Sequence, residues 1–88
     1  MANLTQSEET QYKEHIFLAD NYYNNAHIAL NSGCTVDAMT KLNSALKHYR
    51  DAGEIVMGKS DSAITIAIMG INKCNDLINA IKEESRDR

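Results

Sequence analysis

Three stretches of this 88-residue chain carry apolar residues at alternating spacings of three and four, and no proline interrupts them. Such spacing places the apolar side chains on one face of an α-helix, which repeats every 3.6 residues. A proline inside a helix would cost about 3 kcal/mol, so its absence favours long helices. With short connections, neighbouring helices must run antiparallel. The sequence therefore predicts an all-α protein, an antiparallel three-helix bundle forming a single domain.

The expected helices cover residues 5–32, 35–57 and 61–84, and the charged residues 83–88 are expected to form a short tail. The first apolar stripe consists of Tyr12, Ile16, Ala19, Tyr23, Ala26 and Leu30. The second consists of Ala38, Leu42, Ala45, Tyr49, Ala52 and Val56. The third consists of Ile64, Ala67, Ile71, Cys74, Ile78 and Ile81.

Capping residues and glycines indicate where these helices begin and end. Thr5 and Glu8 have the spacing of a capping box, in which each side chain bonds the other's backbone N–H. Thr35 is expected to be the N-cap of the second helix. Gly53, inside the second stripe, predicts a kink or a close helix contact. Glycine is the usual residue just after the end of a helix. Gly33 and Gly58 directly follow the first and second expected helices.

The most apolar segment is Ser62–Ile81, and we expect it to lie at the centre of the molecule, covered on more than one side. Besides its stripe, this segment carries further apolar residues at Ala63, Ile66 and Met69. Two neighbouring helices cannot cover all of these faces. We therefore expect the surplus residues to form an oligomer interface, and a homodimer is the favoured assembly.

A second candidate surface lies on the first helix, around an unusually asparagine-rich segment. Asparagine is a poor helix former, so packing must hold this part of the helix. Amides and tyrosine hydroxyls offer fixed hydrogen-bonding groups to a partner, and apolar side chains off the stripe offer buried area. The expected protein-binding residues are Phe17, Asn21, Tyr22, Asn25 and Ile28. The alternative is an ordinary solvated face with Tyr23 in the core.

The first two helices resemble a tetratricopeptide (TPR) motif over 34 residues, once. The matching positions are Ala19, Tyr22, Ala26, Gly33, Ala38, Leu42, Ala45 and Leu46. Arg50 stands where that motif closes with proline, and the pattern does not repeat from Ala63 onward. The same residues also resemble the three-helix MIT domain. Either resemblance implies a helical protein-binding module that takes a partner helix or a short peptide.

No pattern of catalytic or ligand-binding residues appears. His15, His27 and His48 have no partner at metal-ligand spacing, and the glycines form no phosphate-binding loop. The sequence thus predicts no catalytic residues, no cofactor and no metal. The net charge of −3 gives no electrostatic reason to expect a nucleic acid or a membrane surface as the partner.

Two cysteines, Cys34 and Cys74, are too few for a disulfide framework, and we expect reduced thiols. The chain shows no signal peptide at its start, and its most apolar segment is too short and too polar to span a bilayer. These features predict a cytoplasmic protein.

The leading functional hypothesis is a non-enzymatic protein-binding or assembly module that acts through its helix surfaces. It would be an adaptor, a chaperone-like protein, or a small inhibitor of a larger protein machine, of phage or bacterial type. The alternative is an oligomeric protein that binds a small ligand or nucleic acid in pockets between subunits. Those pockets would be lined by Tyr22, Asn25, Lys47 and Arg50.

Overall fold

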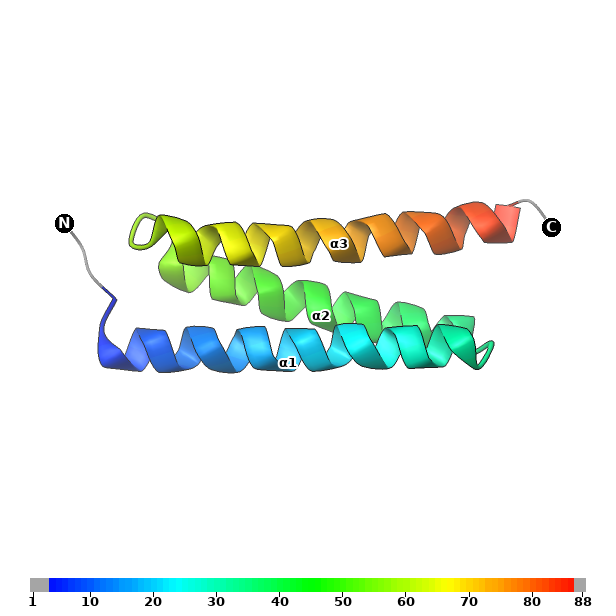
Figure 1. The fold of residues 1–88 in the computed structure, drawn as a ribbon, viewed down its shortest axis with the longest axis horizontal. Coiled ribbons are helices and arrows are strands. Elements are labelled where there is room, and N and C mark those ends of the chain that lie inside the picture. The colour runs from blue at the N-terminus through cyan, green and yellow to red at the C-terminus, as the bar shows by residue number, and fades with distance from the viewer. Residues whose placement is uncertain (1–3, 87–88) are drawn as a thin grey trace.

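The computed structural model describes residues 4–86, which form three helices, α1 (Gln6–Asn31), α2 (Thr35–Val56) and α3 (Asp61–Arg86). Figure 1 shows α1 and α3 running in the same direction, with α2 antiparallel to both. The predicted three-helix bundle is confirmed, and no helix end differs from its expected position by more than two residues. The periodic apolar stripes and the two glycine-containing turns are consistent with this topology.

The ends of the first two helices mostly follow the local sequence signals. Thr5 caps α1 as predicted, because its side chain accepts the Glu8 N–H while the Glu8 carboxylate accepts the Thr5 N–H. Gly33 and Gly58 both have positive φ, as the residue after a helix requires. The predicted cap of α2 is wrong. Helix α2 already includes Thr35, and its N-cap is Cys34, whose side chain makes no capping hydrogen bond.

Helix α2, and not α3, is the central helix. It packs against both α1 and α3, which hardly touch one another. Every residue of the α2 stripe is buried, whereas α3 leaves large apolar residues exposed. The physical reason is the three alanines in the α2 stripe, because small side chains let two neighbours approach the same helix closely. The prediction that Ser62–Ile81 lies at the centre is therefore wrong.

Tyr49 of α2 is the bulky residue that joins the three helices, with 1% of its surface exposed. Its hydroxyl donates a hydrogen bond to the Asp20 carboxylate on α1, and its ring lies against the Gly70 backbone of α3. A Cβ atom at Gly70 would lie 2.5 Å from two ring atoms. A Cβ atom at Gly53 would lie 3.5 Å from Ile64, an ordinary contact. Of the glycines, Gly70 is thus the one packed most tightly, and the close contact predicted at Gly53 is not found there.

Two interactions hold the start of α1 to the end of the bundle where α2 turns into α3. The Tyr12 hydroxyl donates to the Ala63 carbonyl oxygen at 3.1 Å. The Lys59 ammonium donates to the Glu8 carboxylate. This contact with Lys59, together with the Thr5 N–H, lowers the pKa of Glu8 to about 2.

The predicted tail at 83–88 is wrong over residues 83–86, which continue α3. No glycine or proline occurs in this segment, and glutamate and arginine are good helix formers, so nothing local stops the helix. Residues 87 and 88 lie outside the described part of the chain.

Candidate functional site

Two of the three residues predicted to form an oligomer interface are exposed. Ile66 and Met69 lie on the side of α3 that faces α1. Ala63 is half-buried, and its carbonyl oxygen accepts a hydrogen bond from the Tyr12 hydroxyl. Between α1 and α3 lies a groove of about 350 Å³, lined by Asp20, Tyr49, Ile66, Met69, Gly70 and Lys73. Because α1 and α3 meet so little, this groove opens directly to the surface.

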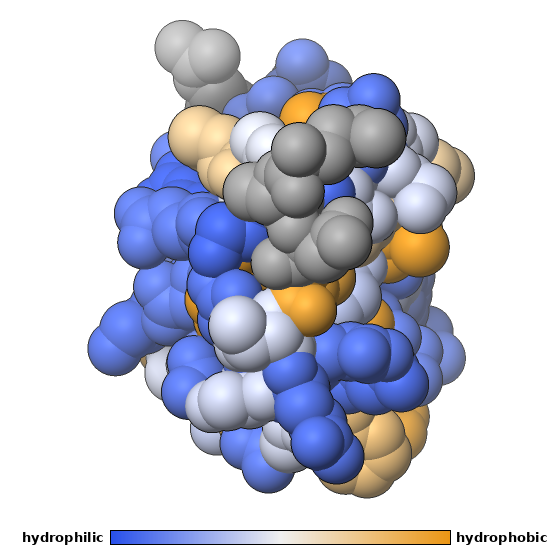
Figure 2. Space-filling view, turned by 90° about the vertical axis from the view of Figure 1, so that its left-hand side faces the viewer, coloured by the Kyte–Doolittle hydropathy of each residue, from blue (hydrophilic) through white to orange (hydrophobic). Residues whose placement is uncertain are grey.

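The apolar surface of α3 also continues on its other side. Ile68 is exposed and lines a second groove, between α2 and α3, together with Arg50, Gly53, Glu54, Met57, Ile64, Ala67 and Ile71. Figure 2 shows the molecule from the end where α1 begins, and there the apolar residues appear as separate patches within a largely hydrophilic surface. The exposed apolar residues of α3 thus lie on both sides of this helix, which packs mainly against α2.

The predicted protein-binding residues of α1 lie on its outer face, with one exception. Phe17 and Ile28 are 67% and 63% exposed, and Asn21 and Asn25 are exposed between them. Phe17 and Ile28 are eleven residues apart, about three helical turns, so they share a face. Tyr22 is half-buried, and its ring stacks on that of His48, with centroids 5.7 Å apart. Tyr22 therefore belongs to the contact between α1 and α2.

The four residues of the alternative ligand site have different surroundings within one chain. Asn25, Lys47 and Arg50 are exposed, and Tyr22 lies against His48 at the contact of α1 with α2. Arg50 instead lines the groove between α2 and α3.

A polar cluster that the sequence did not indicate lies in the α1–α3 groove. The Lys73 ammonium is 3.8 Å from the Asp20 carboxylate and 4.5 Å from the centroid of the Tyr23 ring. Burial, followed by the hydrogen bond to Asp20, raises the pKa of Tyr49 well above its ordinary value. The Tyr49 hydroxyl therefore remains protonated and donates to Asp20. The cluster links α1, α2 and α3 through Asp20, Tyr49 and Lys73.

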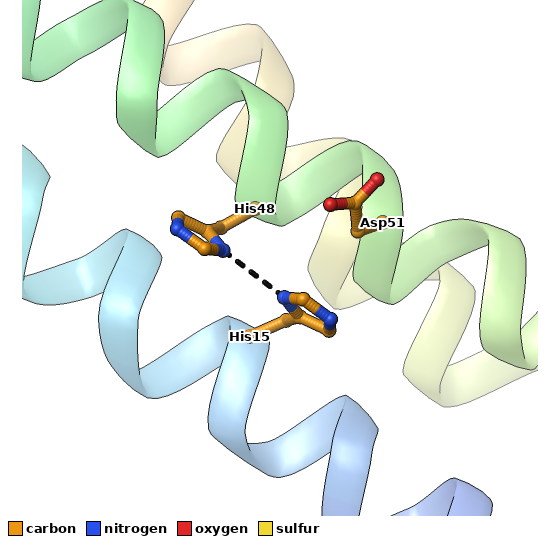
Figure 3. Close-up of side chains that lie close together, drawn as sticks. All are labelled: His15, His48 and Asp51. Atoms are coloured by element: carbon orange, nitrogen blue, oxygen red, sulfur yellow. Dashed lines mark hydrogen bonds between the residues drawn. The ribbon is translucent and has the colours of Figure 1, made fainter.

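A second polar cluster joins α1 to α2 (Figure 3). The Nδ1 atoms of His15 and His48 are 3.0 Å apart, and one potential ligand atom from each histidine and from Asp51 lies within 4.8 Å of the others. All three residues are half-buried. Burial, and next the neighbouring His15, lower the pKa of His48, which favours the neutral imidazole.

Sequence spacing did not reveal this cluster, because 33 residues separate the two histidines. A signal was nevertheless present. His15 is four residues before the buried Ala19, and His48 directly precedes the buried Tyr49, so both flank a core stripe. Residues that flank facing stripes of antiparallel helices can meet across the contact.

Comparison with models of protein families, with curated proteins and with solved structures finds no match to this chain. Within residues 4–86, none of the helices has the length and apolar character needed to cross a membrane.

Proposed function

We propose that this protein is a non-enzymatic protein-binding and assembly module. The observation that carries the proposal is the exposure of Ile66 (51%) and Met69 (63%), two large apolar residues of α3 that line the same groove. Full burial of one such side chain contributes about 1.5–3 kcal/mol. Exposed apolar residues grouped in this way are typical of interaction surfaces.

A second copy of the chain is the occupant that we propose for the groove between α1 and α3. The two charges in this groove, on Asp20 and Lys73, are paired with one another. The groove therefore presents compensated charges to a two-fold related copy when Ile66 and Met69 of both chains come together. A chain of 88 residues also buries a limited core by itself, so the additional interface would stabilise the fold.

The outer face of α1 is our proposed surface for a different protein. Phe17 and Ile28 would supply apolar anchors, and the amides of Asn21 and Asn25 would supply hydrogen bonds between them. A helical module with this face would act as an adaptor, a chaperone-like protein or a small inhibitor. A relationship to the TPR or MIT modules and a cytoplasmic location are part of this proposal, and both cysteines are free within the described residues.

The assembly role is tested by light scattering on polar variants. The double variant Ile66→Gln/Met69→Gln should scatter as a monomer at concentrations where the wild-type chain scatters as a dimer. Val36→Gln is the matched control, because Val36 is 82% exposed at the start of α2, away from the groove. A dimer that is unaffected by the double variant, or lost equally in the control, would contradict the proposed interface.

The α1 surface needs a separate test, the capture of a defined protein partner. Phe17→Ala should abolish capture while leaving the helical circular dichroism signal unchanged, because the Phe17 side chain is largely exposed. Tyr22→Ala is unsuitable, since it would also remove the stacking on His48. Undiminished capture by the Phe17→Ala variant would exclude this face.

A further inference from the structure

We propose that His15, His48 and Asp51 form a binding site for Zn²⁺ or a similar transition-metal ion that joins α1 to α2. This site is separate from the proposed assembly surface, which lies along α3. Its ligands come from two helices, so a bound ion would link them directly.

The separation of the two histidines is close to what tetrahedral coordination requires. Zinc binds imidazole nitrogen at about 2.0–2.1 Å, so two nitrogens of a tetrahedral site are about 3.3 Å apart. The Nδ1 atoms of His15 and His48 are 3.0 Å apart, which leaves a few tenths of an ångström to be gained by small side-chain rotations. The two Nδ1 atoms already face each other across the helix contact (Figure 3).

Asp51 supplies the third ligand and the charge balance. It follows His48 by three residues on α2, so the two side chains share a helix face. Two neutral imidazoles and one carboxylate carry a single negative charge against the two positive charges of the ion. Imidazole nitrogen with carboxylate oxygen suits zinc better than magnesium or calcium, which prefer oxygen ligands alone. Three protein ligands leave the fourth position to water, as in zinc sites that accept an external ligand.

The surroundings hold this arrangement in place. The Tyr22 ring stacks on the His48 ring with an interplanar angle of 8°, which fixes the imidazole plane. All three ligands are half-buried between the helices, so they are less hydrated than ligands on an open surface. The fixed orientation of His48 reduces the reorganisation needed for binding, while the Asp51 carboxylate, which lies within 4.8 Å of the two nitrogens, moves to about 3.3 Å from them. Without a metal ion, the two Nδ1 atoms form a hydrogen bond with each other. In that bond one imidazole donates its Nδ1–H and the other accepts at an unprotonated Nδ1.

The test uses the metal-stripped full chain with Cys34→Ser, which removes an exposed thiol that could itself bind zinc. Calorimetric titration with zinc should give one ion per chain, and zinc should raise the midpoint of thermal unfolding, whereas magnesium should do neither. His15→Asn should abolish zinc binding, and Asp51→Asn should weaken it by at least about tenfold. His27→Asn is the control, because His27 is exposed on α1 outside the cluster and should leave binding unchanged.

Cobalt(II) provides a second measurement, since its visible absorption reports tetrahedral coordination. A tetrahedral spectrum in the Cys34→Ser chain that disappears in the His15→Asn variant is the expected result. Circular dichroism of each variant identifies any that fails to fold, and the Asp51→Asn variant tests the site independently of the histidines. Absence of zinc binding by the folded Cys34→Ser chain, or equal binding by the His15→Asn variant, would overturn the proposal.

Discussion

Replacing Gly70 with alanine should destabilise this protein, although the same change inside a helix ordinarily stabilises it. Alanine has the higher helix propensity, by about 1 kcal/mol. At Gly70, however, the added Cβ atom would lie 2.5 Å from two atoms of the Tyr49 ring, about 1 Å closer than carbon atoms pack in protein interiors.

The Tyr49 side chain has little freedom to relieve this overlap. It is 1% exposed, and its hydroxyl is held by the Asp20 carboxylate on the opposite helix. Overpacking of a core costs about 1–3 kcal/mol, and a displaced hydrogen bond about 1 kcal/mol more. After subtraction of the gain in propensity, we expect Gly70→Ala to lower the free energy of unfolding by about 1–3 kcal/mol.

Urea unfolding followed by circular dichroism, at one protein concentration, measures the effect. Gly53→Ala is the matched control in α2, because its Cβ atom would make ordinary contacts at 3.5 and 3.6 Å. That variant should be more stable than wild type, by about 0.5–1 kcal/mol. In a Tyr49→Leu background, which removes the ring, Gly70→Ala should lower the free energy of unfolding by much less. A Gly70→Ala variant as stable as wild type would refute the contact between Tyr49 and Gly70.

Three further predictions follow from the helix ends and the polar contacts. Cys34→Ser should stabilise the protein by about 0.5–1 kcal/mol in thermal unfolding, because serine caps a helix N-terminus and Cys34 does not. Tyr49→Phe should cost about 1–2 kcal/mol in urea unfolding, because the hydrogen bond to Asp20 is lost. The Glu8 pKa is lowered from 4.5 to about 2 by Lys59, so its contribution to stability is complete above about pH 4.5 and is lost as the pH falls towards 2. In the Glu8→Gln variant, the free energy of unfolding should depend less on pH over that range. An unchanged pH dependence would show that the Glu8–Lys59 ion pair does not cause the loss of stability in acid.

The local features of the fold were predictable because their causes are local. The Thr5–Glu8 capping box and the glycines after α1 and α2 depend on a few consecutive residues. The buried α2 stripe depends on helical periodicity alone. Such signals act within one helix and do not require knowledge of its neighbours.

Features that depend on the register between helices were not predictable in this way. The most apolar segment, Ser62–Ile81, was expected at the centre. The central helix is instead α2, because its small side chains let both neighbours pack closely against it. The contacts of Tyr49 with Gly70 and of His15 with His48 join residues 21 and 33 positions apart. Helical periodicity predicts which face of its own helix a residue occupies. It does not predict which residue of the neighbouring helix that residue contacts.

The mass of the wild-type chain in solution tests the proposed assembly most directly. Sedimentation equilibrium at micromolar concentrations should give twice the 9.8 kDa mass of one chain. Dilution should then shift the population towards the monomer, as expected when Ile66 and Met69 are buried against a second copy. A mass of 9.8 kDa across the whole concentration range would contradict the proposal that α3 is the surface through which this protein assembles.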